Sequence, residues 1–269
     1  MENFDIVFIV LTYRTAIDLH DFIKSLESNP QKFSYKVIVV NSFFDQKTSL
    51  EIKEIAKSHK CDFIECENKG YGYGNNFGIN FAKENYKFNY LVVSNADIII
   101  QNFDIQELDK CNAEVIAPQI RTLSGKKQNP IMDKYSRFSE KAMYYGQKNK
   151  NKIFIFISLI INKIKNKKNN FINRKNKIRQ IYAAHGSFVI FKQSIFKKLD
   201  KIYDENLFLF CEEGDIAKQF QSKNIKTILN ENIKVLHKED GSMSVSNINI
   251  NNELSKSYIY YYEKWNNYL

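Results

Sequence analysis

The stretch "NKGYGYGNNFG", residues 68–78, contains four of the nine glycines in a chain of 269 residues. Glycines gathered in this way mark a backbone that turns sharply or is closely approached. The apolar run "CDFIEC" (61–66) precedes the stretch and predicts a strand, and apolar residues at helical spacing follow it from Ile79. The stretch therefore predicts a tight turn between a strand and a helix of an α/β unit.

The dinucleotide-binding motif G-x-G-x-x-G also joins a strand to a helix, but its spacing is absent here. Counted from Gly70, the third glycine position is Asn75, and counted from Gly72 it is Phe77. The motif also belongs after the first strand of its fold, whereas this stretch follows the third. The glycines therefore do not indicate a dinucleotide loop.

Short apolar runs alternate with segments of helical spacing over the first 120 residues. The runs are "FDIVFIVL" (4–11), "YKVIVVN" (35–41), "CDFIEC" (61–66) and "YLVVSN" (90–95). Near-continuous apolar strands between amphipathic helices predict an α/β fold, an α/β/α sandwich whose central sheet is mainly parallel. Ligands bind beyond the carboxyl ends of such strands, which directs attention to Thr12–Arg14, Asn41–Asp45, Asn68–Gly74 and Asn95–Asp97.

The rest of the chain divides into three segments. Residues 121–180 are rich in Lys and Asn and contain one apolar run, "IFIFISLII" (153–161). Residues 181–245 predict a strand at 181–191, a short helix at 194–199, an acidic helix at 212–223 and two short strands within 226–237. Residues 246–269 predict an aromatic helix. We therefore expect one domain over 1–245, with a binding half at 1–120, a basic insertion at 121–180 and a second half at 181–245.

The formal net charge of +10 belongs to one segment rather than to the whole protein. Residues 121–180 carry a net charge of +15 and the remainder carries −5. Few aromatic residues interleave with these lysines, which disfavours a nucleic-acid-binding surface. No apolar run is long enough to span a membrane, and the N-terminal residues do not resemble a secretion signal. The four cysteines lack metal-site spacing, so we expect reduced thiols and a cytoplasmic location.

The apolar run at 153–161 leaves two interpretations open. Nine apolar residues flanked by lysines suit an interfacial helix on an anionic membrane surface, over residues 150–178 at the inner face of the cytoplasmic membrane. The alternative is a partly disordered insertion whose apolar run packs on the core.

Three polar features have the composition of a reactive site. Asp97 ends the strand of "SNADI" and is either a ligand for a hard divalent cation or the acid of a turn or helix cap. Glu212, Glu213 and Asp215 open a helix; such acids favour the helix dipole, but like charges this close also raise one pKa and make a general base. His237 ends a strand as a metal ligand or as a structural histidine.

Taken together, these sequence features resemble the family 2 glycosyltransferases with the GT-A fold, in particular bacterial rhamnosyltransferase-like members that build surface polysaccharides. The features also occur in the same order along the chain as in that family. The resemblance covers residues 5–245 and is weakest at 126–180. The most specific piece is "NKGYGYGNNFG", which is similar to N-x-G-[FY]-[GA]-x-[GA]-N-N-x-G. The other pieces are "IVLTYRT", "VIVVNSFFD", "YLVVSNADI", "RTLSGK", "HGSFVIFKQSIF", "FLFCEEGDIA" and "VLHKEDGS".

The resemblance implies transfer of a sugar, with inversion, from a nucleotide-diphosphate sugar to a hydroxyl of a glycan or lipid-linked acceptor. The implied donor is dTDP-rhamnose or a UDP-hexose, and the setting is capsule or lipopolysaccharide O-antigen synthesis. Asp97 and His237 would hold Mg²⁺ or Mn²⁺, and Glu213, or Glu212 in its place, would act as the base. Residues expected at the donor are Thr12, Tyr13, Arg14, Asn41, Asp45, Gly70, Asn75, Asn76 and Asn95; those expected at the acceptor are His185 and Gly186.

The sequence departs from the family pattern at three places. The loop after the second apolar run, Asn41–Asp45, lacks the leading acid, so recognition of the base is expected to differ. Asn95 replaces an acid of the longer metal motif, which leaves Asp97 as the main carboxylate. Glu213 replaces an aspartate at the base, and a displacement of about 1 Å there is kinetically costly.

Two other classes remain as alternatives to an enzyme that transfers sugars. A non-catalytic sugar-nucleotide or glycan-binding module on the same fold is disfavoured by the retained acids at 212–215. An NAD-linked oxidoreductase is disfavoured by the spacing of the glycines.

Overall fold

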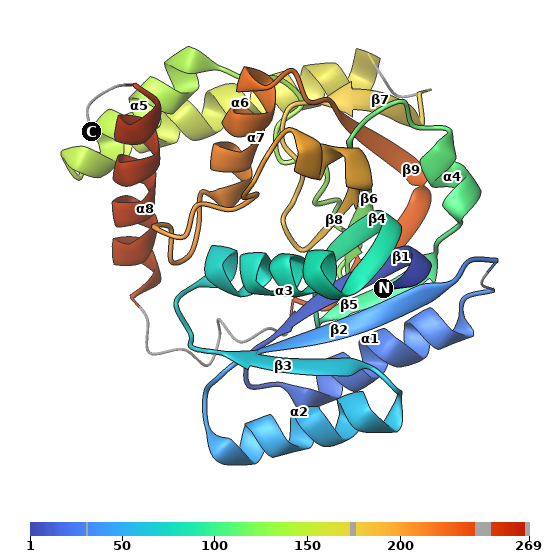
Figure 1. Ribbon diagram of the computed structural model, residues 1–269. Helices are drawn as coiled ribbons and strands as arrows, with labels where there is room; N and C mark the ends of the chain where they lie inside the picture. Colours follow the sequence, from blue (N-terminus) through green and yellow to red (C-terminus); the bar gives the residue numbers. More distant parts are fainter. Residues whose placement is uncertain (31, 173–175, 240–248, 267–269) are drawn as a thin grey trace.

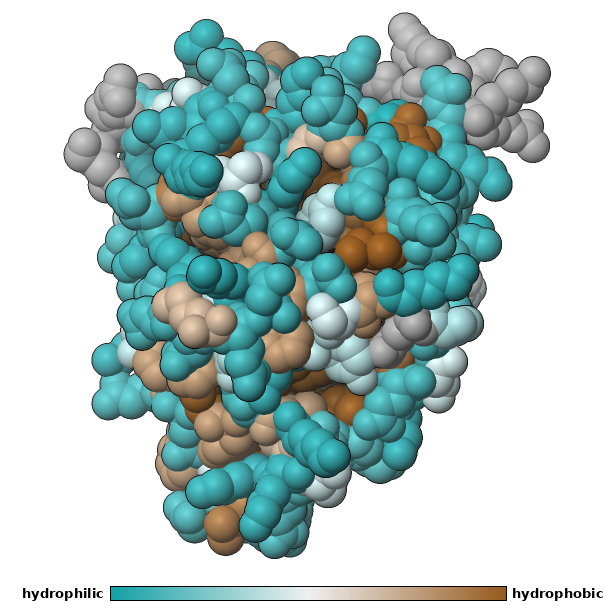
Figure 2. Space-filling model, turned by 45° about the vertical axis from the view of Figure 1, so that its right-hand side comes forward, coloured by the Kyte–Doolittle hydropathy of each residue, from teal (hydrophilic) through white to brown (hydrophobic). Residues whose placement is uncertain are grey.

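A computed structural model describes residues 1–30, 32–172, 176–239 and 249–266. One central sheet runs through the molecule in the strand order β3-β2-β1-β4-β8-β6-β9-β5, and β7 pairs with β9 (Figure 1). Its helices lie on both sides of the sheet, as the alternation of apolar runs predicts. The face drawn in Figure 2 is mostly hydrophilic, with hydrophobic side chains in separate patches.

The N-terminal half of the sheet is parallel, and its inner strands are apolar and buried on both faces, as is typical of parallel sheets. Its strands are β1 (Glu2–Thr12), β2 (Tyr35–Ser42), β3 (Asp62–Cys66) and β4 (Tyr86–Asn95). Alternate residues of β1 enter two separate cores, one under the first two helices and one under the third. These helices are α1 (Ala16–Ser28), α2 (Gln46–Ser58) and α3 (Tyr71–Asn85).

The C-terminal half of the sheet is mixed, so the parallel arrangement expected from the sequence holds only for β1 to β4 and for the β6–β9 pair. Its strands are β5 (Ile98–Asn102), β6 (Val115–Thr122), β7 (Ile178–Ile181), β8 (Phe188–Lys192) and β9 (Thr227–His237). Strand β9 is continuous where two short strands were expected, because a register shift against β6 absorbs its irregular middle. The segment around 194–199 forms a short 3₁₀ helix, η1 (Gln193–Lys197).

The basic segment contributes a pair of packed helices, α5 (Arg137–Lys148) and α6 (Lys152–Ile172). The apolar run at 153–161 lies inside α6, and the hydroxyl groups of Ser139 and Ser158 hydrogen-bond at 2.9 Å between the two helices. Helix α8 (Ile250–Trp265) packs against α5, where the rings of Tyr144 and Tyr262 stack with centroids 4.1 Å apart. These helices stand beside α7 (Glu212–Ser222), and α4 (Ile105–Asp109) lies on the opposite side (Figure 1).

Parts of four predicted segments lie outside the described residues. These parts are residue 31 of the binding half, 173–175 of the insertion, 240–245 of the second half and 246–248 and 267–269 of the C-terminal segment. The four cysteines are free and buried or half-buried, as the sequence predicts.

Candidate functional site at the carboxyl ends of the strands

The carboxyl ends of β1, β2 and β4 meet at one edge of the sheet, because Thr12 is paired with Asn41 and Leu11 with Asn95. Thr12 is fully buried, and its hydroxyl donates to the carbonyl oxygen of Val40 at 3.2 Å. The amide of Asn41, 2% exposed, donates to the carboxylate of Glu65 at 2.9 Å. Thr12 and Asn41 therefore shape this edge from inside the sheet. Asn95 is half-buried at the end of β4.

Aromatic and cationic side chains gather in the loops that follow β1 and β2. The guanidinium carbon of Arg14 lies 3.9 Å from the ring centroid of Phe44 and 4.9 Å from that of Tyr13. The two rings meet edge to face with centroids 5.7 Å apart. Asp45 caps α2 by accepting a hydrogen bond from the backbone N–H of Thr48 at 2.8 Å, and this bond lowers the pKa of its carboxyl.

Asp97 and His237, the two residues predicted to bind metal, lie together. Strands β5 and β9 pair Ile98 with His237, and Nε2 of His237 is 3.2 Å from Oδ2 of Asp97. The Nδ1 atom of His237 lies 2.8 Å from Oε1 of Gln128, an oxygen that can only accept. Nδ1 therefore carries the proton and donates, while Nε2 faces the carboxylate. Gln128, which no sequence motif indicated, sets the orientation of this histidine.

The chemistry of this pair fits a hard divalent cation. When Nε2 is unprotonated, it and the carboxylate oxygen 3.2 Å away can both ligate a cation, since adjacent ligands of an octahedral ion with bonds of about 2.1 Å are about 3.0 Å apart. Among the described residues no group of three His, Cys, Asp or Glu side chains has metal-binding geometry. Two protein ligands would therefore leave most coordination positions to a bound diphosphate and water.

The glycine-rich stretch contains the turn predicted between β3 and the next helix, but helix α3 begins within it, at Tyr71. Gly70 precedes the helix with φ +109°, and a Cβ atom there would lie 2.5 Å from the carbonyl oxygen of Phe208. A Cβ atom at Gly74 would lie 2.6 Å from a methyl group of Leu11. The protein's own loop and strand therefore occupy the space that these glycines leave on the Cβ side, which gives the glycines a packing role. A contact between Gly70 and a sugar nucleotide stays a prediction.

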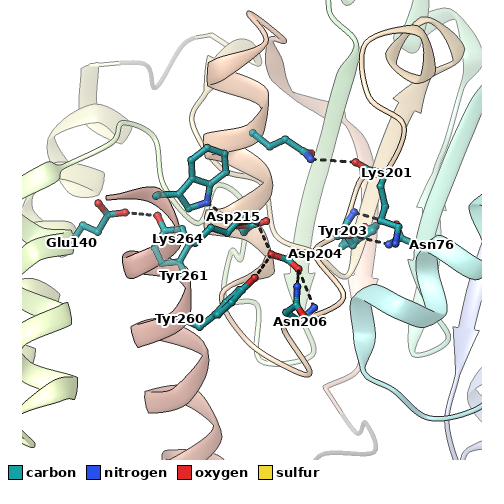
Figure 3. Close-up of polar contacts among 12 residues, drawn as sticks. Asn76, Glu140, Lys201, Tyr203, Asp204, Asn206, Asp215, Tyr260, Tyr261 and Lys264 are labelled. Atoms are coloured by element: carbon teal, nitrogen blue, oxygen red, sulfur yellow. Dashed lines mark hydrogen bonds and ion pairs between the residues drawn. The ribbon is translucent and has the colours of Figure 1, made fainter. Parts of the chain in front are cut away.

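Two of the three asparagines of this stretch, Asn75 and Asn76, are buried inside the protein. Asn76 is 2% exposed; its Nδ2 donates to the carbonyl oxygen of Tyr203 at 2.9 Å, and its Oδ1 accepts from the N–H of the same residue at 3.1 Å (Figure 3). Its amide is thus committed to the 203–205 loop rather than to a ligand. Asn75 is fully buried, donates to the carbonyl oxygen of Tyr71 at 3.0 Å, and has no hydrogen-bond partner at Oδ1 within the described part of the chain.

The three acids at the start of α7 have three different environments. Glu212 is 6% exposed, and burial together with the charge of Glu213 raises its pKa to about 8. Glu213 is half-buried, and its Oε1 accepts from the N–H of Gly186 at 3.3 Å. Asp215 is 1% exposed and accepts from Nζ of Lys264 and Nε1 of Trp265, each at 2.7 Å (Figure 3). Asp215 therefore anchors α8, and a part for it in catalysis stays a prediction from the sequence.

A pocket of about 210 Å³ lies beside Glu213, between α5, α6, α7 and α8. Its walls combine tyrosine rings with small polar groups and include Tyr135, Met143, Ser158, Tyr258 and Tyr261. Asp215 does not line it. The aromatic residues of α8, to which the sequence assigned no role, and the helices of the basic insertion thus form the surroundings of Glu213.

His185 and Gly186 connect the acid pair to the metal pair. The ring of His185 lies 5.7 Å from that of His237, measured between centroids, and Gly186 donates to Glu213. The N–H of His185 donates to Asn129 at 2.7 Å, and burial lowers the pKa of its ring. Asp97, His237, His185, Gly186 and Glu213 therefore form one continuous site.

No known protein-family model matches the chain. A curated relative, the low-salt glycan biosynthesis hexosyltransferase Agl10 of Haloferax volcanii, is 24% identical over 226 residues, or 82% of this chain. The match covers 63% of that protein, so the chain spans about three fifths of its relative's length.

Two solved structures have the same arrangement of elements. Residues 1–349 of TarS from S. aureus, in complex with UDP, match with a TM-score of 0.56 at 13% identity, over 87% of this chain and 60% of that one. GalNAc-T7 with UDP, GalNAc and Mn²⁺ matches with a TM-score of 0.61 at 11% identity, over 87% of this chain and 44% of that one. The α/β architecture expected from the sequence is confirmed: the chain has the GT-A fold of glycosyltransferases.

Proposed function

We propose that this chain is a glycosyltransferase that moves a sugar from a nucleotide-diphosphate donor to a hydroxyl group of a glycan or lipid-linked acceptor. The observation that carries the proposal is the continuity of the site. Asp97 and His237, the two residues proposed to bind a metal ion, lie next to His185, whose ring contacts that of His237. The following residue, Gly186, donates a hydrogen bond to Glu213, which lines a pocket. The likeness to a hexosyltransferase, and the UDP bound in two structures of the same fold, support the donor class.

Glu213 is the proposed general base, and Glu212 is its neutral neighbour. The pKa of Glu212 is raised to about 8, so its carboxyl retains a proton at neutral pH. Two adjacent carboxylates avoid ionising together, so the negative charge resides on Glu213, which lines the pocket. The N–H of Gly186 fixes one oxygen of Glu213 and leaves the carboxylate to accept the proton of an acceptor hydroxyl.

The geometry of a single displacement follows from this assignment. The acceptor oxygen attacks the anomeric carbon from the face opposite the diphosphate, so the configuration inverts. A nucleoside diphosphate leaves as an anion and needs no protein acid. Mg²⁺ or Mn²⁺ held by Asp97 and His237 would supply Lewis-acid stabilisation of the charge on that leaving group.

The donor proposed first is a UDP-hexose, because the curated relative is a hexosyltransferase and UDP is bound in two structures of the same fold. The rhamnosyltransferase-like resemblance of the sequence keeps dTDP-rhamnose as the second donor. The proposed setting is bacterial surface polysaccharide synthesis in the cytoplasm, at the inner face of the membrane.

Helix α6 is the proposed contact with that membrane, within residues 150–178. It exposes a group of large apolar side chains together with lysines: Ile153, Phe154, Phe156, Leu159, Ile160, Ile164, Lys163, Lys165 and Lys167. No helix in the described ranges is long and apolar enough to cross a bilayer. The combination instead suits a helix that lies in the interface of an anionic leaflet.

Release of nucleoside diphosphate from a panel of sugar nucleotides, with Mn²⁺ and with and without glycan acceptors, tests the proposed activity. We expect one donor to be cleaved and the cleavage to be accelerated by an acceptor. If sugar nucleotides bind but none is cleaved under any condition, the chain is a binding module on the same fold. If none binds, the proposed function is wrong.

A further inference from the structure

The N-terminal end of helix α3 contacts both chain segments that surround Glu213. One of them is the loop that leads into α7. The backbone N–H of Tyr71 donates to the carbonyl oxygen of Phe208 in this loop at 2.9 Å. Further along the helix, the buried amide of Asn76 binds both the N–H and the carbonyl oxygen of Tyr203 (Figure 3). The glycine-rich stretch therefore holds the loop in front of the acidic helix at two points.

The other segment contains Gly186, which precedes β8. The hydroxyl group of Tyr71 donates to the carbonyl oxygen of Gly186 at 2.8 Å. The N–H of the same glycine donates to Oε1 of Glu213 at 3.3 Å. The ring of Tyr71 packs edge to face against that of Tyr203, with centroids 5.8 Å apart, which keeps the hydroxyl group in its place. Two consecutive hydrogen bonds through Gly186 therefore connect Tyr71 to Glu213.

The position of Gly186 decides where the carboxylate of Glu213 points. Within the described part of the chain, the N–H of Gly186 is the one hydrogen-bond donor that reaches this carboxylate. Glycine has more backbone freedom than other residues, so its N–H keeps one direction only where neighbouring groups hold it. The residues on either side of Gly186 are hydrogen-bonded to other segments, and the Tyr71 hydroxyl group completes this support at the glycine itself.

We propose that Tyr71 is a positioning residue for the general base: its hydroxyl group holds Gly186, and Gly186 holds the carboxylate of Glu213 beside the acceptor pocket. This inference rests on the proposed function. Tyr71 acts through Gly186 rather than on the reacting atoms, so its loss affects deprotonation of the acceptor and leaves the proposed metal and diphosphate site at Asp97 unchanged. A displacement of about 1 Å at a catalytic group lowers the rate by about 100-fold, so a small shift of Gly186 has a measurable effect.

Tyr71→Phe tests this proposal, because it removes the hydroxyl group and keeps the ring against Tyr203. At a temperature where calorimetry shows the variant to be folded, kcat for sugar transfer should fall by about 10- to 100-fold. The KM for the donor, and the dissociation constant of UDP in Mn²⁺, should remain those of the wild type. Tyr73→Phe is the matched control: it makes the same chemical change on the same helix, at a residue whose ring stacks on that of the exposed Phe77. It should turn over as the wild type does.

A double-mutant cycle with Glu213→Gln separates positioning from a general structural role. In the Glu213→Gln background, Tyr71→Phe should cause no further loss of turnover, because the base that Tyr71 positions is already absent. An equal factor of loss in both backgrounds would overturn the inference, and so would a wild-type kcat for Tyr71→Phe; both results leave the proposed function intact. Weaker donor binding by Tyr71→Phe with an unchanged kcat would also overturn it and would assign Tyr71 to the donor. Failure of the wild type to bind or cleave any sugar nucleotide would overturn the proposed function itself.

Discussion

The ammonium group of Lys264, near the end of α8, lies 2.7 Å from the carboxylate of Asp215 on α7 and the same distance from that of Asp204 (Figure 3). Asp215 is 1% exposed and also accepts from the indole N–H of Trp265. The third acid of the "EEGD" sequence is therefore a structural anchor. It fixes the helix on which Glu212 and Glu213 are carried, and it does so through residues at the far end of the chain.

Asp215→Asn should destabilise the protein without removing its chemistry. The substitution leaves a partly buried ammonium group with one carboxylate instead of two, at a cost of about 2 kcal/mol. The melting temperature should fall by about 4–8 °C, measured by scanning calorimetry. Turnover at a temperature where the variant is fully folded should be close to wild type. Complete loss of turnover in the folded variant would show that Asp215 takes part in catalysis.

Glu212 should make stability depend on pH. Its folded pKa is about 8 and its unfolded value is 4.5, so between these values the folded state holds a proton that the unfolded state has released. Stability therefore falls as pH rises through this window and is constant on either side of it. Glu212→Gln should melt increasingly above wild type from pH 5 to pH 8. Parallel melting curves for the two proteins across this range would contradict the assignment. The charged or titratable groups that face Glu212 include Glu213, Asp215, Tyr71, Tyr203 and Cys211.

Glu213→Gln should lower turnover by at least about 100-fold, because general-base catalysis typically contributes that much. Donor affinity should remain unchanged, since the substitution is isosteric and lies on the acceptor side. Glu212→Gln is the matched control, and at pH 7 it should retain turnover because the native carboxyl is already neutral. Steady-state kinetics and donor titrations on both variants decide whether Glu213 or Glu212 is the base. The reverse pattern would make Glu212 the base.

Asp97→Asn should weaken Mn²⁺-dependent binding of a nucleoside diphosphate by about tenfold or more, because it removes the main anionic ligand of the proposed site. Gln128→Leu should weaken it less, within about tenfold, because Gln128 only orients His237. Binding of a nucleoside without phosphates should not change in either variant. Thermal-shift titrations with and without Mn²⁺ measure these effects. An unaltered Mn²⁺ dependence in Asp97→Asn would exclude this pair as the metal site.

The parts of the fold that the sequence predicts well are those with a strong local pattern. Strands β1 to β4 are continuous apolar runs with helices between them, and a parallel arrangement follows from burial on both faces. The position of β8 between β4 and β6 has no such signal. It depends on pairs such as Val92 with Ile190, which are almost 100 residues apart in the chain.

The candidate site was likewise predictable from the sequence only where short local motifs mark its residues. The motifs that resemble glycosyltransferases led to Asp97, His237 and Glu213, but sequence alone could not separate the roles of the three acids. The partners of Asp215 lie 49 and 50 residues further along the chain. The partner of Glu213 is a backbone N–H on another segment.

The exposed face of α6 gives the last prediction. Ile153, Phe156 and Ile164 are 69%, 63% and 62% exposed, and burial of such side chains in lipid is favourable by about 25 cal/mol per Å². The wild-type protein should float with vesicles that contain phosphatidylglycerol, more weakly in high salt, and not with pure phosphatidylcholine.

Replacement of these three residues by serine should abolish flotation. The matched control replaces Ile17 and Leu50, which are 64% and 50% exposed on α1 and α2, and it should float as the wild type does. Because the inner side of α6 lines the pocket of Glu213, loss of flotation should also slow transfer to a lipid-linked acceptor while leaving donor hydrolysis unchanged. Unchanged flotation of the serine variant would show that this face does not bind membranes. A dimer formed by the wild type but not by the serine variant, measured by light scattering, would instead assign this face to contact with a second copy of the chain.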